Sequence, residues 1–147
     1  IIDVINRSVD FVKMSSKNKI NVHTTKKKSM INGDAEQLNR VFINLIKNSE
    51  ESFLDIVKKD LNFKGKIDIE IISNNDYIVV RLTDNGTGIS DTKKVMTPYF
   101  TTKTKGTGLG LPIVSKIINE HSGDFLIKNK KDGNGVDIEI SFPKINA

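Results

Sequence analysis

Apolar side chains recur at the spacing of one helix face in three parts of the chain, and this pattern predicts three helices. They cover residues 2–14, residues 34 to about 58, and residues 111–120. Asp34 is a good N-cap for the second helix, and Gln37 three residues later completes a capping-box pattern. The segments between the helices must then supply the strands.

Alternating apolar and polar residues predict four longer strands. Residues 66–73 and 77–83 form a first pair around the turn Asn74-Asn75-Asp76. Residues near 124–128 and 136–142 form a second pair. The members of each pair are close enough in the chain to form a hairpin.

A weaker alternation at Ile20-Asn21-Val22 and at Met30-Ile31 predicts two short strands around a turn that contains Lys26-Lys27-Lys28. The resulting order is helix, short strands, helix, hairpin, helix, hairpin. The sequence therefore predicts an α+β fold of two layers, with helices on one face of a mixed, mostly antiparallel sheet. A run of parallel βαβ units does not fit this order.

Length and composition indicate one domain over residues 1–147. Hydrophobic residues make up 37% and charged residues 28%, the balance of a soluble globular domain. No apolar run approaches the roughly 20 residues that a membrane-spanning helix needs, and no signal peptide opens the chain. The absence of cysteine excludes disulfides and thiolate zinc sites. Because the chain starts at Ile1, we expect it to be a piece of a longer protein. The lack of cysteine fits a reducing compartment, and we expect a cytoplasmic location.

The net charge of +5 raises the question of nucleic-acid binding. Lysine supplies most of the positive charge and is spread along the chain. Arginine, the preferred base reader, occurs only at Arg7, Arg40 and Arg81. Aromatic residues, which stack on bases, make up only 6%. We therefore expect solvated lysine-rich surfaces and no nucleic-acid partner.

Two glycine-spaced loops are the strongest functional signal. Asp84-Asn85-Gly86-Thr87-Gly88 follows a predicted strand, and Gly106-Thr107-Gly108-Leu109-Gly110 leads into the third helix. Their uncovered backbone N–H groups, together with the positive end of the helix, can bind the phosphates of a nucleotide. Neither loop fits the commoner phosphate motifs, because Leu111 stands where a Rossmann fingerprint needs glycine and Gly65-Lys66 runs into Ile67.

Two kinds of polar residue accompany these loops. Asn44 and Asn48 are four apart on the second helix, so their amides project from the same face, and a carboxamide oxygen can bind Mg²⁺. Taken alone, such a pair is also common on solvated helix faces. Asp84 ends an apolar strand, where a carboxylate can accept the exocyclic amine of adenine. Asn85-Gly86 is also a hairpin signal, but residues 88–94 do not alternate as a second strand.

Four segments in this order resemble the catalytic ATP-binding domain of sensor histidine kinases. They are Asn44-x-x-x-Asn48, the Asp84 loop, Pro98 to Lys103 and the second glycine loop, and they are similar to the N, G1, F and G2 boxes. The resemblance covers nearly the whole chain and is closest to the nitrogen-regulation group. It implies a Bergerat fold, with ATP in a cleft between the helix layer and a lid.

The resemblance also implies a role for each matching residue. Asn48 would bind Mg²⁺ on the ATP phosphates, with Asn44 lining the same site. Asp84 would hold the adenine amine, and residues 90–105 would form the ATP lid. Asn44 and Lys103 are the candidates for a direct part in catalysis. The implied nucleotide-binding set also contains Gly86, Gly88, Ile89, Thr102, Lys103, Lys105, Gly106, Thr107, Gly108, Leu109 and Gly110.

Three positions depart from the family pattern, Glu51, Val136 and Thr97, and Asn44 departs from the pattern of related ATPases. Thr97 stands where an acidic residue often precedes the Pro of the F box. Glu51 stands where many family members carry a basic residue, so its phosphate contact would pass to the lid lysines. Val136 replaces a frequent Thr, which removes a hydroxyl near adenine. Asn44 also stands at a position where the ATPases of the same fold, those of the gyrase, Hsp90 and MutL type, are similar in carrying a Glu. That Glu would act as the general base that activates the attacking water. Because an amide cannot take the proton, transfer to a protein acceptor is favoured over hydrolysis.

The phospho-acceptor is expected outside this chain. His23 and His121 both lack the sequence context of the family's acceptor histidine, and we interpret them as structural. The implied partners are an N-terminal dimerisation and histidine-phosphotransfer domain and a response-regulator receiver domain in a phosphorelay. The parent kinase would be a homodimer, with or without an inner-membrane anchor, and the isolated domain a monomer. A degenerate nucleotide-binding docking module and a serine-directed kinase of the same fold are the alternatives.

Overall fold

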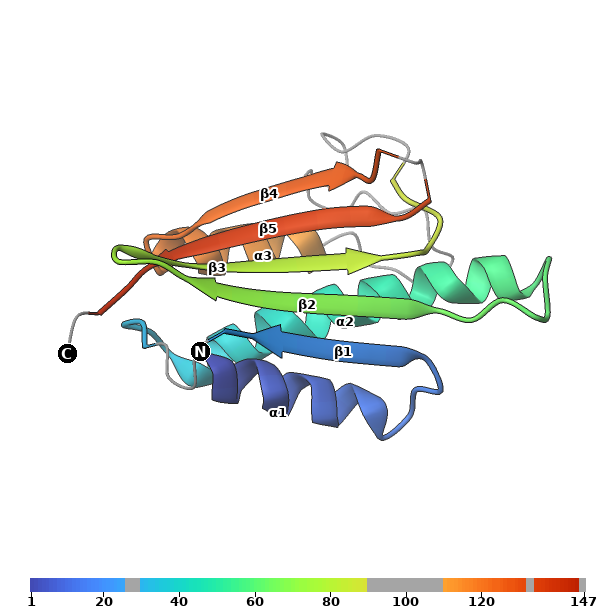
Figure 1. The fold of residues 1–147 in the computed structure, drawn as a ribbon, viewed down its shortest axis with the longest axis horizontal. Helices are drawn as coiled ribbons and strands as arrows, with labels where there is room; N and C mark the ends of the chain where they lie inside the picture. Colours follow the sequence, from blue (N-terminus) through green and yellow to red (C-terminus); the bar gives the residue numbers. More distant parts are fainter. Residues whose placement is uncertain (26–29, 90–109, 132–133, 146–147) are drawn as a thin grey trace.

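The structure, a computed structural model, describes residues 1–25, 30–89, 110–131 and 134–145. The helices in these ranges are α1 (Ile2–Lys13), α2 (Ala35–Val57) and α3 (Gly110–Glu120), and the strands are β1 (Lys19–Thr24), β2 (Lys66–Ser73), β3 (Tyr77–Asp84), β4 (Asp124–Asn129) and β5 (Val136–Pro143). α2 and α3 lie against one face of the sheet, and α1 packs beside α2 (Figure 1). This arrangement confirms the predicted α+β fold. Within the described ranges, no helix is both long and apolar enough to span a membrane.

The five strands form one mixed sheet in the order β1-β2-β3-β5-β4. Neighbours pair in antiparallel fashion except β1 and β2, which are parallel, with Ile20 opposite Ile67. Because α2 separates β1 from β2 in the chain, β2 can return in the same direction as β1. The predicted short strand at Met30-Ile31 is wrong. Met30 lies outside the sheet, and its carbonyl accepts a hydrogen bond of 3.0 Å from the backbone N–H of Ile145.

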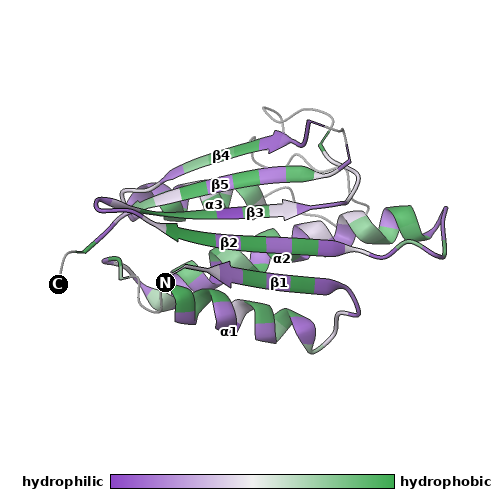
Figure 2. Cartoon of the chain, viewed as in Figure 1, coloured by the Kyte–Doolittle hydropathy of each residue, from purple (hydrophilic) through white to green (hydrophobic). Residues whose placement is uncertain are grey.

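Alternation along the strands separates a core face from an outer face, and hydrophobic and hydrophilic residues accordingly alternate along the strands in Figure 2. On the outer face, Arg81 donates a 3.0 Å hydrogen bond to Glu139, and its guanidinium lies 3.7 Å from Asp137. The hydrogen bond and this second carboxylate raise the pKa of Arg81. On the core face the central strands bury Ile67, Ile69, Ile71, Ile78, Val80, Leu82, Ile138, Ile140 and Phe142.

One end of the helix layer, where α2 begins and α3 ends, is held by specific hydrogen bonds. Asp34 caps α2 as predicted, since its Oδ1 accepts from the backbone N–H groups of Glu36 and Gln37 at 2.9 and 3.2 Å. The reciprocal half of the predicted capping box is replaced by a tertiary contact. The Asp34 backbone N–H donates to Nε2 of His121, at 3.0 Å, at the end of α3.

α3 ends in a Schellman motif. Ser122 has a left-handed φ of 58°, its N–H donates to Asn119 O, and the Gly123 N–H donates to Ile118 O. A Cβ on Gly123 would lie 2.7 Å from the backbone oxygen of Ser141, so the chain passes directly onto the sheet here. The motif turns α3 back into β4.

Candidate functional site

The carboxylate of Asp84 is the centre of the candidate site. It ends β3 and is buried, with 4% of the residue exposed. Its Oδ2 accepts a 2.6 Å hydrogen bond from Ser49 Oγ on α2. Its Oδ1 accepts from the backbone N–H groups of Gly86 and Val136, at 3.0 and 3.1 Å. An ionised carboxylate has about four acceptor positions. Three donors from the described residues therefore leave room on Oδ2 for a donor from a ligand.

Two of these three donors were not predicted. Ser49 falls on the buried face of α2, among apolar residues. A hydroxyl within an otherwise apolar stripe was the available signal. Val136 donates through its backbone N–H. The Val that stands here in place of the family's frequent Thr therefore keeps this contact to Asp84, although it lacks the Thr hydroxyl.

Two glycines allow close approach around Asp84. A Cβ on Gly86 would lie 2.0 Å from Ser52 Oγ on α2. Gly135 has a φ of +118°, and a Cβ there would lie 1.9 Å from the backbone oxygen of Asp84. Gly86 is a predicted site residue, whereas Gly135 is not. A side chain at Gly135 would displace the backbone that holds the carboxylate, whereas a side chain at Gly86 would first displace the Ser52 hydroxyl.

Asn44 and Asn48 lie on the same side of α2, as predicted. Both are partly exposed, and Ser52 continues their row one turn further along the helix. Because Ser52 abuts Gly86, the row of amides runs along α2 toward the loop that follows β3. The structure thus brings the predicted metal-binding amides and the predicted base-recognition corner to the same side of the helix layer.

The loop from Asn85 to Ile89 is held at both ends by asparagine side chains. Asn85 Oδ1 accepts from Lys66 N at 2.7 Å, and its Nδ2 donates to Lys64 O at 3.1 Å. Asn129, the last residue of β4, makes the equivalent pair with Ile89. Gly88 between them has a φ of +75°, a left-handed conformation that favours glycine. Asn129 was not predicted, because nothing in its local sequence points to the loop.

Gly110 is the first residue of α3. A Cβ there would meet no atom of the described residues within 4 Å, so packing among them does not require a glycine. The remaining predicted positions lie outside the described residues. They are the lid at 90–105, which includes Thr102, Lys103 and Lys105, and the loop residues Gly106, Thr107, Gly108 and Leu109.

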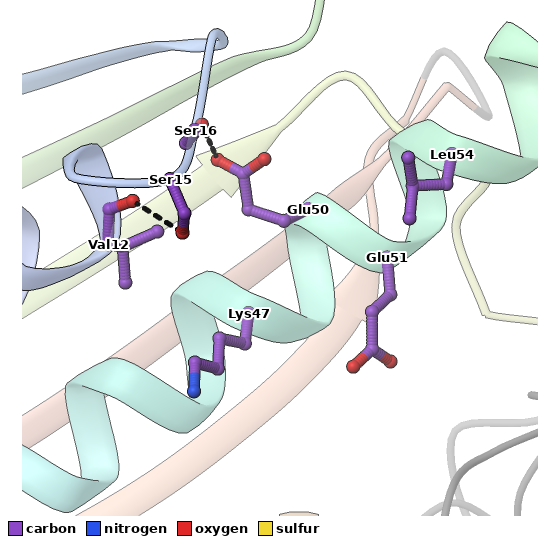
Figure 3. A pocket seen from close by; sticks show the side chains of 7 residues that line it. All are labelled: Val12, Ser15, Ser16, Lys47, Glu50, Glu51 and Leu54. Carbon is purple, nitrogen blue, oxygen red and sulfur yellow. Dashed lines mark hydrogen bonds between the residues drawn. The ribbon is translucent and has the colours of Figure 1, made fainter.

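A hollow of about 230 Å³ lies elsewhere, between the end of α1 and the outer side of α2. Figure 3 shows Glu50 directed toward Ser16, which donates to it at 2.6 Å, and Glu51 directed away from this pair. None of the candidate nucleotide-binding residues lines this hollow. The described residues also contain no group of three His, Cys, Asp or Glu side chains that could hold a metal ion.

Comparison with known proteins gives consistent results. The sequence profile described as "Histidine kinase-, DNA gyrase B-, and HSP90-like ATPase" matches residues 33–146. Sporulation kinase A of Bacillus subtilis (strain 168) is 40% identical over 116 residues, which are 78% of this chain and 18% of that protein. Nitrogen regulation protein NtrY of Azorhizobium caulinodans is 33% identical over 110 residues, 74% of this chain and 14% of that protein. The chain thus spans less than a fifth of these curated relatives.

Solved structures agree with the sequence matches. The catalytic domain of histidine kinase ThkA, in a nucleotide-free form, superposes with a TM-score of 0.81 at 28% identity. The match covers 98% of this chain and 92% of that one. A mycobacterial sensor histidine kinase, MprB, has the same fold, with a TM-score of 0.80. The resemblance that the four sequence motifs predicted is therefore confirmed.

Proposed function

This chain belongs to the family of histidine kinase-, DNA gyrase B- and Hsp90-like ATPases, and from that premise we propose that it binds Mg-ATP for transfer of the γ-phosphate to a histidine on an adjoining dimerisation domain. It acts as a single catalytic domain over residues 1–147 of a cytoplasmic or membrane-anchored sensor kinase. The observation that carries the proposal is the buried Asp84 carboxylate, held by three donors and open to one more.

The adenine amine is the donor that completes this carboxylate. The Asp84 carboxylate is a fixed hydrogen-bond acceptor. It favours a base that carries an exocyclic amine and disfavours a base that carries a carbonyl oxygen at that position. Ser49 and the two backbone donors prevent the carboxylate from rotating, because they engage both of its oxygens. Asp84 thus orients the base, and the orientation of the base places the phosphates along α2.

Asn48 supplies a neutral oxygen for Mg²⁺, with Asn44 beside it on the preceding turn. Mg²⁺ commonly keeps several waters and takes its other ligands from substrate phosphates, so one protein amide is a sufficient donor set. When bound, the ion neutralises charge on the transferring phosphoryl group. Gly110 lets the first turn of α3 approach the phosphates, where its N–H groups and the positive helix end favour anions.

Transfer to a partner is favoured over hydrolysis by Asn44. A carboxamide cannot accept the proton of an attacking water, so no general base occupies this position of α2. His121 is not available as a nucleophile either. Its Nε2 accepts from the Asp34 backbone N–H, and its Nδ1 lies 2.7 Å from Ile117 O, so the ring carries its proton on Nδ1. His23 is exposed on the outer face of β1, away from Asp84 in the sheet order.

Calorimetric titration with ATP tests the base-recognition part. We expect Asp84→Asn to weaken ATP binding by roughly tenfold to a hundredfold, since a charge-assisted hydrogen bond contributes about 1.5–3 kcal/mol. Asp124→Asn, an exposed carboxylate at the start of β4, is the matched control and should bind ATP normally. Unchanged ATP affinity in Asp84→Asn contradicts this placement of the adenine.

Transfer of radiolabelled γ-phosphate tests the catalytic part. The isolated chain should not label itself, and it should label an added dimerisation and phospho-acceptor domain from the parent kinase. A degenerate docking module would bind the acceptor domain and leave it unlabelled. Efficient labelling of His23 or His121 in the isolated chain would overturn the proposed division between donor and acceptor domains.

A further inference from the structure

The side chain of Asn129 extends the edge of the sheet by one residue pair. Its Oδ1 accepts from the Ile89 backbone N–H at 2.7 Å, and its Nδ2 donates to the Ile89 carbonyl at 2.6 Å. A carboxamide that engages both the N–H and the C=O of one residue imitates a strand neighbour. Ile89 is therefore attached to the end of β4, although the two residues are 40 positions apart.

This attachment also accounts for a glycine of the base loop. Gly88 precedes Ile89, and a Cβ on Gly88 would lie 2.9 Å from Asn129 Oδ1. The backbone oxygen of Gly135 lies 3.5 Å from the same Cβ position. Two features thus favour glycine at position 88, its φ of +75° and the closeness of the Asn129 carboxamide. Gly88 and Asn129 therefore form one structural unit.

The loop that begins at Asp84 therefore has two fixed ends. At its start, Gly86 N donates to Asp84, and the Asn85 side chain pairs with the backbone at Lys64 and Lys66. At its end, Asn129 holds Ile89. Without the second attachment, Gly86 and Gly88 would leave the end of the loop free to sample many backbone conformations. A ligand that needs one conformation would then have to order the loop on binding.

We propose that Asn129 is a positioning residue for nucleotide binding, which preorganises the Gly86–Ile89 backbone beside Asp84. This inference rests on the proposed function, because it names a further determinant of the same nucleotide site. Asp at this position would place a carboxylate against the Ile89 carbonyl, and Ala has no polar group that could replace the carboxamide.

The test combines ATP calorimetry with hydrogen exchange of the Ile89 amide in the full chain. For Asn129→Ala we expect faster Ile89 exchange and roughly tenfold weaker ATP binding, the size that two neutral hydrogen bonds predict. Asn129→Asp keeps the acceptor for the Ile89 N–H and repels the Ile89 carbonyl, so it should also weaken ATP binding. The matched control is Lys128→Ala, an exposed neighbour on the same strand, which should change neither readout.

The outcomes separate this inference from the proposed function. Weaker ATP binding with a nearly unchanged thermal unfolding midpoint supports it, because Asn129 is exposed and a purely structural loss would lower the midpoint as well. Faster Ile89 exchange with unchanged ATP affinity overturns the positioning role. If the wild-type chain itself does not bind ATP, the proposed function fails first and the inference fails with it.

Discussion

The hydroxyl of Ser49 donates a 2.6 Å hydrogen bond to Oδ2 of Asp84, and both residues are buried. The bond joins the middle of α2 to the end of β3 across 35 positions of sequence. It fixes the helix that carries the two candidate metal-binding amides relative to the carboxylate that we propose receives the adenine amine. In that proposal, one hydrogen bond relates the phosphate end of the candidate site to its adenine end.

Ser49→Ala should lower the free energy of unfolding by about 1.5–3 kcal/mol, because a buried carboxylate loses a donor. Urea denaturation measures this change. Ser52→Ala, on the next turn, removes a hydroxyl that donates to a helix carbonyl and should cost less than about 1 kcal/mol. A double-mutant cycle with Asp84→Asn should show coupling. Strictly additive effects would mean that the hydroxyl stabilises the fold independently of the carboxylate.

Gly135→Ala should destabilise the protein by at least about 3 kcal/mol, since a positive φ costs roughly 1–3 kcal/mol before any clash is counted. The added Cβ would also collide with the backbone oxygen of Asp84. We therefore expect the surviving folded protein to bind ATP more weakly as well. Thermal unfolding and calorimetry on the same preparation measure both effects, and a wild-type midpoint would show that β5 can shift without cost.

Gly110→Ala is the opposite case. No described atom opposes a Cβ at this position, and Ala is favoured over Gly in helices by up to about 1 kcal/mol. Stability should be maintained or increased, whereas ATP affinity should fall about tenfold if the phosphates approach this backbone. Equal ATP affinity in wild type and variant would remove Gly110 from the nucleotide-binding set and leave its glycine unexplained by the ligand.

Ser122→Gly should stabilise the protein by roughly 0.5–1 kcal/mol. Ser122 holds a left-handed φ of 58° at the end of α3, a conformation that costs an L-residue about 1 kcal/mol and glycine almost nothing. The control Ser115→Gly lies inside α3 and should lower stability. Urea midpoints compare the two variants, and a loss of stability in Ser122→Gly would show that the serine side chain contributes more than its backbone strain costs.

Local pattern was sufficient for most of the elements. Period-two alternation placed β2 and β3 within one residue of their observed ends, and the Asn74 turn forms as predicted, with Asn74 Oδ1 accepting from Asp76 N and Tyr77 N. The weak apolar pair at Met30-Ile31 failed because two residues carry little periodicity. β1 instead finds its partner in β2, beyond the whole of α2.

Part of the candidate site could be predicted from sequence because its chemistry is encoded in short motifs. Asp84, Gly86 and Gly88 lie within five residues, and Asn44 and Asn48 within one helical turn. Ser49 and Gly135 could not be assigned a role, because their roles exist only through contact with Asp84 from other elements.

Periodicity and spacing are local properties of the chain, and they were sufficient to predict the helices, the hairpins, the order of the motifs and hence the family. The packing of the elements, in contrast, sets which groups donate to the carboxylate of Asp84 and which side chain holds Ile89. Hydrogen bonds between residues 35 and 40 positions apart depend on how α2 and β4 pack around the sheet. No local pattern encodes that packing, because it is set by the shape of the whole core.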